Sequence, residues 1–150
     1  MHSQTESDTP QFPLDDDCFA IRQAARYISQ LYDRHLGHTG LKITQFSIMT
    51  RLLGGRRMTM KALAEAMVME RTTLVRAIQP LQRDGLLHSI ASAADPRALT
   101  VALTAAGEDK WQSALQCWYA AQKEFEEHFG PERAASLRRE LFDLTGKKTL

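Results

Sequence analysis

The sequence contains few cysteines, no long apolar run and almost no net charge. Its two cysteines, Cys18 and Cys117, are too few for a disulfide framework, so we expect a reducing, cytoplasmic environment. No apolar stretch approaches the roughly 18 residues that a membrane-spanning helix needs. Residues 1–17 are polar and acidic, and they lack the basic start and apolar core of a secretory signal. These absences predict a protein with no membrane partner and argue against a secreted, disulfide-rich one.

The patterns that enzymes and metal proteins use are absent as well. The five histidines are scattered, and no group of Cys or His has the spacing of metal ligands. The sequence has neither a glycine-rich phosphate loop nor a nucleophile-elbow motif. We therefore expect no catalytic activity, no cofactor and no metal site.

The charges that are present are unevenly distributed. Residues 51–97 contain eight basic and four acidic side chains, whereas the rest of the chain contains 11 basic and 14 acidic ones. A basic middle segment between acidic flanks is typical of a protein in which one module contacts phosphates.

Hydrophobic periodicity predicts a mainly α-helical (α+β) fold. Residues 1–14 have no helical period and are predicted to be a flexible tail, and residues 15–150 are predicted to form a single domain. We expect Thr44 and Thr59 to cap the second and third helices, and Pro80 to bend or shorten the fourth. The expected helices cover residues 15–37, 45–53, 60–67, 71–83, 105–129 and 131–146, and the expected strands cover residues 86–92 and 98–103.

Residues 60–85 fit a helix-turn-helix, in which a support helix precedes a helix whose start enters the major groove of DNA. Arg76 can reach a guanine edge or a phosphate, and Gln79 can read adenine. After this unit, Asp95 and Arg97 lie at the tip of a predicted hairpin, where Arg97 can enter the minor groove and Asp95 can support the tip. The candidate DNA contacts are Arg51, Arg56, Arg57, Lys61, Arg71, Thr72, Thr73, Arg76, Gln79 and Arg97.

In this order and spacing, the fragments resemble the MarR family of bacterial regulators over residues 16–145. The matching fragments are Thr44-Gln45, Leu63-Ala64-Glu65, Arg71-Thr72-Thr73-Leu74 with Arg76, Asp84-Gly85-Leu86-Leu87, Asp95 with Arg97, and Leu103-Thr104-Ala105-Ala106-Gly107. The resemblance implies a winged helix-turn-helix core at about 42–103 and dimerisation helices at about 15–37 and 104–146. It also implies a homodimeric repressor that binds a palindromic operator in double-stranded DNA and is released by a small molecule or an oxidant. Pro80 departs from the family pattern.

A narrower resemblance links the start of the chain to the branch of this family that senses organic hydroperoxides. Cys18 stands where that branch has its reactive thiol, and Tyr32 matches one of the tyrosines that the partner subunit supplies. Cys117 is the counterpart of a second cysteine that forms an intersubunit disulfide in some members. The second expected tyrosine is replaced by Ile43. The alternative interpretation is that both cysteines are buried small hydrophobic residues.

Two further expectations concern ligands and partners. The resemblance implies a pocket between the dimerisation helices and the winged module, and Phe19, Tyr27, Phe46 and Met49 are candidates to line it around a small aromatic effector. Plain core packing is the alternative for each of them. A winged-helix module that binds proteins and has lost DNA binding is a further alternative function.

Overall fold

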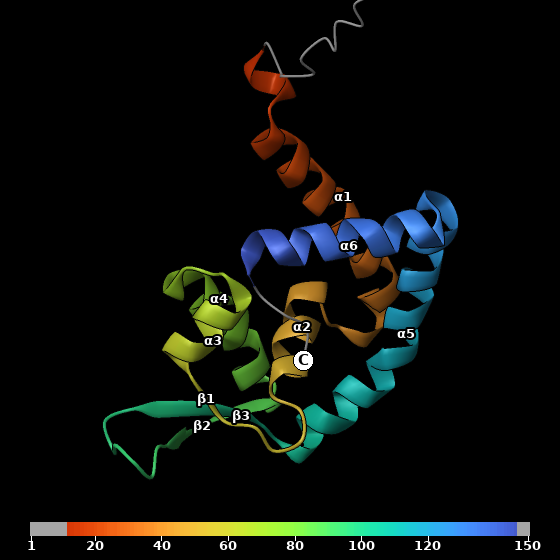
Figure 1. Ribbon diagram of the computed structural model, residues 1–150. Coiled ribbons are helices and arrows are strands. Elements are labelled where there is room, and N and C mark those ends of the chain that lie inside the picture. The colour runs from red at the N-terminus through yellow and green to blue at the C-terminus, as the bar shows by residue number, and fades with distance from the viewer. Residues whose placement is uncertain (1–11, 147–150) are drawn as a thin grey trace, which may run out of the picture.

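A computed structural model describes residues 12–146. Of the predicted tail, residues 1–11 lie outside the described residues, and Pro13–Asp15 form a short 3-10 helix, η1. The principal elements are α1 (Asp17–Leu36), the 3-10 helix η2 (Gly37–Thr39), α2 (Ile43–Arg51), β1 (Met58–Thr59), α3 (Met60–Met67), α4 (Arg71–Arg83), β2 (Leu87–Ala91), β3 (Leu99–Leu103), α5 (Ala105–Phe129) and α6 (Pro131–Thr145). Figure 1 shows α2, α3, α4 and the sheet gathered into one lobe, with α5 and α6 running along its side and top. The predicted mainly α-helical, winged architecture is confirmed.

The sheet is antiparallel and has the strand order β1-β3-β2. Strands β2 and β3 form the predicted hairpin, with Leu87 opposite Leu103 and Ala91 opposite Leu99. Strand β1 was not predicted, and it pairs Met58 with Val101 of β3. This third strand ties the chain before α3 to the hairpin, so the helix-turn-helix and the wing form one unit.

The core of that unit is apolar and tightly closed. Leu63 of α3, Leu74 and Ile78 of α4 and Leu52 after α2 are all at most 2% exposed. Ala114 of α5 belongs to the same cluster, so the long helix is packed onto the winged unit. A second, smaller cluster joins Leu31 and Tyr32 of α1 to Ala121 of α5.

Several helix starts are capped by side chains, and one of the predicted caps is wrong. Thr59 accepts a hydrogen bond from the Ala62 amide (3.1 Å), as expected for the cap of α3. Thr44, however, lies inside α2, which begins at Ile43. Asp33 of α1 accepts the Ile43 amide hydrogen (2.7 Å), and the Gln45 side chain accepts that of Lys42 (3.0 Å). Because a carboxylate from another helix accepts the Ile43 amide, α2 begins two residues earlier than the predicted start at Gln45.

Pro80 does not shorten α4, which continues to Arg83 as the sequence predicted from its other residues. The proline lies in the last turns of the helix, between the buried Ile78 and Leu81. Because these two neighbours are fixed in the core, the helix tolerates the loss of one backbone donor.

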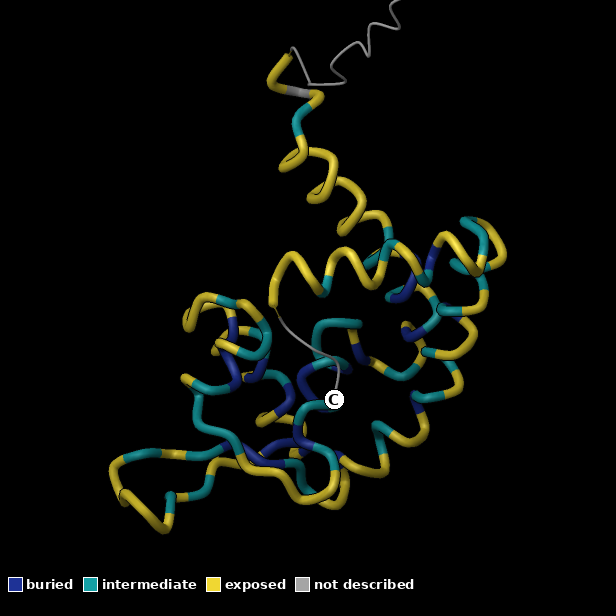
Figure 2. Tube along the Cα trace, viewed as in Figure 1, coloured by how far each residue is buried: buried dark blue, intermediate teal, exposed yellow. Residues whose placement is uncertain are grey.

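The N-terminal half of α1 makes little contact with the rest of the chain. Residues 17–27 are all exposed, and they extend away from the body in Figures 1 and 2. Only the second half of α1 packs on α5. Within residues 12–146, no helix combines the length and apolar character required to span a bilayer.

Candidate nucleic-acid interface

The turn between α3 and α4 is tight and is closed by backbone hydrogen bonds. Val68 adopts a left-handed conformation (φ 52°, ψ 47°) that ends α3. The Val68 amide donates to the Glu65 carbonyl (3.2 Å), and the Met69 amide donates to the Ala64 carbonyl (2.9 Å). This turn sets the start of α4 relative to α3, as a helix-turn-helix requires.

The start of α4 is exposed and lacks a side-chain cap. Glu70 is the N-cap residue, but its side chain accepts no capping hydrogen bond. Arg71, Thr72 and Thr73 are exposed in the first turn. A helix N-terminus carries amide donors and a partial positive charge, both of which favour a phosphate. The beginning of α4 thus combines backbone, hydroxyl and guanidinium donors.

Two further predicted contacts continue the exposed face of α4. Arg76 and Gln79 follow Thr72 at spacings of four and seven residues, which places all three on one side of the helix. Both side chains are exposed, while Leu74 and Ile78 on the opposite side are buried. The structure therefore brings Thr72, Arg76 and Gln79 together on a surface that can enter a groove.

The tip of the β2–β3 hairpin is held by Asp95. Its carboxylate accepts the backbone amide of Arg97 (3.0 Å), and its carbonyl accepts the amide of Ala98 (3.0 Å). The turn is closed by the Ser92 amide, which donates to the Ala98 carbonyl (2.9 Å). Asp95 thus orders the backbone that presents the exposed Arg97 side chain, and it does so without forming an ion pair with the guanidinium.

Two contacts that sequence analysis missed join α4 and α5 to the wing. Gln82 near the end of α4 donates to the Ser89 hydroxyl of β2 (3.0 Å). At Gly107, a side chain would place its Cβ 2.1 Å from the Leu86 carbonyl oxygen, so only glycine allows α5 to approach the start of the wing this closely. The matching Leu103-Thr104-Ala105-Ala106-Gly107 fragment was the only sequence signal of this approach.

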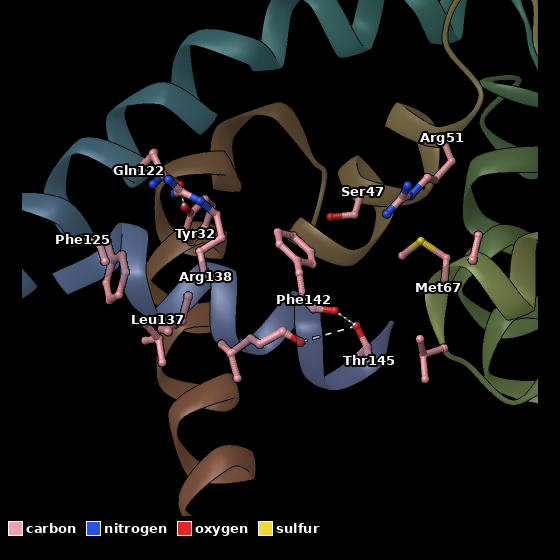
Figure 3. A pocket seen from close by; sticks show the side chains of 15 residues that line it. Tyr32, Ser47, Arg51, Met67, Gln122, Phe125, Leu137, Arg138, Phe142 and Thr145 are labelled. Atoms are coloured by element: carbon pink, nitrogen blue, oxygen red, sulfur yellow. Dashed lines mark hydrogen bonds between the residues drawn. The ribbon is translucent and has the colours of Figure 1, made fainter. Parts of the chain in front are cut away.

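The remaining predicted cations separate into two groups. Arg56 and Arg57 are exposed in the loop before β1, and Lys61 is exposed at the start of α3. Arg51 is half-buried at the end of α2, and it lines a cavity beneath α6 (Figure 3). Arg51 thus differs from the three exposed cations in lining a cavity, and its role as a phosphate contact stays a prediction.

The predicted redox residues are not brought together within one chain. Cys18 is exposed in the first turn of α1. Tyr32 lies about 21 Å further along the same helix at 1.5 Å per residue, and its hydroxyl donates to Gln122 of α5. Burial raises the pKa of Tyr32, and the nearby Glu126 carboxylate raises it further, whereas Arg138 lowers it. Cys117 is half-buried on α5, with its Sγ atom 3.4 Å from Nε2 of His38.

The four candidate pocket residues also lie apart. Phe19 and Tyr27 are exposed on α1, whereas Phe46 and Met49 are buried, and Phe46 also lines a hollow of about 410 Å³ beside Trp111 and Trp118. A cavity of about 570 Å³ lies between α6 and the winged unit, and it includes Tyr32 and Arg51 in its lining. The contribution of α6 to this cavity could not be predicted from the sequence, because no local signal shows where that helix crosses the domain.

Comparison with known proteins agrees with this geometry. The model of the MarR family matches residues 41–99. The transcriptional regulator MosR of M. tuberculosis, solved in complex with DNA, is 36% identical, with 88% of this chain and 95% of that chain covered and a TM-score of 0.76. A probable transcriptional regulator from Pseudomonas aeruginosa is 25% identical over 87% of this chain and 97% of its own, with a TM-score of 0.76.

A third structure supports the fold alone. The transcriptional repressor CouR, bound to a 23-mer DNA duplex, is 18% identical over 92% of this chain and 99% of that chain, with a TM-score of 0.78. A comparison with curated protein sequences gives no match. The family model, the 36% identity to MosR over nearly its whole length and the winged helix-turn-helix together show that this chain belongs to the MarR family of transcriptional regulators, which are DNA-binding proteins and not enzymes.

Proposed function

We propose that this regulator binds a palindromic operator in duplex DNA as a homodimer and acts as a repressor. Its two α4 helices enter successive major grooves roughly 34 Å apart, and Arg97 of each wing enters the flanking minor groove. The observation that carries the proposal is the pairing of an exposed, uncapped helix start at α4 with a wing tip ordered around Arg97. Lys61, Arg56 and Arg57 supply phosphate contacts beside them.

A second copy of the chain is required for this geometry. The exposed first half of α1 carries Phe19 and Ile21, and α6 carries Leu144, all large apolar side chains that are exposed in the single chain. Amphipathic helices of this kind are buried by association. We assign α1, α5 and α6 to the dimer interface.

Release from DNA follows from the same architecture. The spacing of the two α4 helices depends on how each winged unit sits on the dimerisation helices. A ligand that favours one dimer geometry over the other therefore changes DNA affinity. The cavity between α6 and the winged unit lies at this junction and supports release by a small molecule.

The test is a fluorescence-anisotropy titration with duplex DNA from the region upstream of the protein's own coding sequence. We expect tight binding whose affinity falls steeply with salt, because phosphate contacts release counterions. Replacing Arg97 with Ala should weaken binding by about tenfold and reduce the log–log salt slope by about one for each guanidinium removed from the DNA. The matched control is Arg133→Ala on α6, whose guanidinium stacks on Phe129 away from the winged unit.

A shallow salt slope for the wild type would instead favour a winged module that binds proteins. Unchanged affinity in Arg97→Ala would refute the minor-groove contact while leaving the α4 assignment to be tested by Arg76→Ala. Thiol-based sensing through Cys18 stays a prediction. It requires Tyr32 of a second chain, since the two residues of one chain lie at opposite ends of α1.

A further inference from the structure

The cavity beneath α6 is long and largely apolar. Its volume of about 570 Å³ is within the usual range for small-molecule sites. On α6 its lining runs from Ala134 to Thr145, a distance of about 16 Å at 1.5 Å per residue. Leu137, Leu141 and Phe142 of α6 line the cavity together with Met67 of α3 and Phe125 of α5. In Figure 3, Phe125 lies near Leu137 at one end, and Met67 lies beyond Phe142 at the other. Such a space accommodates an extended chain better than a single planar ring.

The charged side chains of this lining are all positive. Arg138 and Arg51 are the two charged residues among the described residues that line the cavity, and none of these lining residues carries a carboxylate. Arg138 lies 3.8 Å from the Glu126 carboxylate, which balances its charge. Among the residues that the structure describes, Arg51 has neither a hydrogen-bond nor an ion-pair partner. Because this half-buried guanidinium has no counter-charge, it is the group in the cavity with which an anionic ligand would form an ion pair.

Arg51 is accompanied by a hydroxyl donor. Ser47 precedes it by one turn on α2 and lines the same cavity. In Figure 3, the Ser47 hydroxyl and the Arg51 guanidinium lie on the same side of α2 and face Phe142. The two side chains can donate hydrogen bonds to the two oxygens of one carboxylate. The apolar side chains of α6 can then pack against the hydrocarbon part of the same ligand.

We infer that this cavity binds a linear-chain monocarboxylate of the fatty-acid class, with its head group on Arg51 and Ser47 and its chain along α6. The inference rests on the proposed function, because it names the ligand class of the proposed effector site. The same cavity is lined by Ala66, Met67 and Val68, at the end of α3 and in the turn that sets α4. A bound chain therefore touches the segment that orients the recognition helix.

A neighbouring hollow gives the competing ligand class. Arg51 and Ser47 also border a space of about 410 Å³ that has four aromatic side chains in its lining, together with Thr50 and Leu115. The aromatic residues are Phe46, Trp111, Trp118 and Tyr119. A compact aromatic acid would suit that space. Arg51 would bind the carboxylate in both cases, so the shape of the ligand's hydrocarbon part decides which of the two cavities it occupies.

The experiment is isothermal titration calorimetry of the full-length protein with decanoate, decanol and benzoate, each below its aggregation limit. We expect decanoate to bind at least tenfold more tightly than benzoate. Arg51→Gln should lower the affinity for decanoate at least tenfold and leave the affinity for decanol unchanged. Arg139→Gln removes the same charge from α6 outside the lining and should leave both affinities unchanged.

Leu137→Trp, which fills the cavity, provides a second variant that does not depend on Arg51, and its folding is checked by its melting curve. It should abolish decanoate binding. No decanoate binding to the wild type, equal binding in Arg51→Gln, or preference for benzoate would each overturn the inference. The first of these is also the result expected if a second copy of the chain fills the cavity.

DNA anisotropy on the same samples separates this inference from the proposed function. DNA binding without decanoate binding refutes the ligand site and leaves the operator-binding proposal intact. Decanoate binding that depends on Arg51 but does not release DNA supports the site and refutes release by this ligand class. Failure of the wild type to bind DNA in the absence of any ligand refutes the proposed function.

Discussion

Val68 holds a backbone conformation that β-branched residues rarely adopt. Its φ of 52° lies in the left-handed region. Because its side chain is 65% exposed, side-chain packing offsets little of the conformational strain energy. The left-handed conformation costs an L-residue about 1–2 kcal/mol, whereas glycine loses about 0.5–1 kcal/mol in chain entropy. Val68→Gly should therefore raise the free energy of unfolding by about 0.5–1 kcal/mol, measured by urea denaturation at an unchanged m-value.

The control for this substitution is Val75→Gly. Val75 is also exposed, but it lies within the right-handed helix α4. Glycine should destabilise the protein there by about 0.3–0.5 kcal/mol, the difference in helix propensity between valine and glycine. A decrease in stability in both variants would show that the turn at Val68 is not strained.

Glu124 connects α1 to α5 and makes the stability of that connection depend on pH. Its carboxylate accepts from His35 (3.0 Å) and pairs with Arg34 (2.7 Å). The hydrogen bond from His35, together with the nearby Arg34 charge, holds the pKa of Glu124 below its usual value in spite of a smaller opposing effect of desolvation. A carboxyl whose folded pKa is depressed stabilises the fold above its unfolded pKa, and this contribution disappears as the pH falls through the folded pKa.

Comparison of wild type with Glu124→Gln tests this dependence. The wild type should be more stable at pH 6, and the difference should disappear as the pH falls below about 4.3, the usual glutamate pKa. Glu127→Gln, which removes an equally negative side chain from the same helix, corrects for net charge. A difference that stays constant down to pH 3 would contradict the assignment.

At the scale of the element, the Asp95 side chain helps to order the tip of the wing. The Asp95 carboxylate accepts the Arg97 amide hydrogen and fixes the hairpin tip (3.0 Å). Asp95→Ala removes this acceptor and frees the tip, so we expect DNA affinity to fall several-fold. Asp95→Asn retains a carbonyl acceptor and should keep most of the affinity, measured by anisotropy at one salt concentration. If Asn weakens binding as much as Ala, the charge of Asp95 matters and its role in the turn does not.

Helices could be predicted from the sequence more accurately than contacts between elements. The bounds of α3 and α4 followed from recurring apolar positions and from Thr59, because both signals are local. The start of α2 was wrong because its determinant, Asp33, belongs to another helix. Strand β1 has only two residues, which carry no periodic signal, and it exists through its pairing with β3.

The same distinction applies to the candidate site. The exposure of Arg76 and Gln79 could be predicted, because both lie opposite the apolar positions of one helix. The position of Arg51 beside a cavity could not, since charge alone does not show which side of α2 packs under α6. The exposed face of α4 could therefore be predicted from the sequence, and the structure was needed to show that Arg51 lines a cavity.

At the scale of the whole molecule, the single chain leaves apolar surface uncovered at both ends of the fold. Ile21 on α1 is 45% exposed and Leu144 on α6 is 70% exposed. The first half of α1 has no packing partner within residues 12–146, which a stable 20-residue helix of this amphipathic pattern requires. We expect analytical ultracentrifugation to give a dimer of the 16.9 kDa chain at micromolar concentration.

Charge placed on this surface should dissociate the dimer and weaken DNA binding together. Ile21→Glu buries an unpaired carboxylate if the surface is an interface, so the sedimentation coefficient should shift toward that of the monomer. Operator affinity should fall by at least tenfold in the same variant, because one winged unit then binds a half-site alone, without the effective concentration that a linked second unit provides. Gln23→Glu adds the same charge two residues away at a polar position and should leave both quantities nearly unchanged. A wild-type monomer that binds a full operator with high affinity would show that the apolar face of α1 serves another purpose.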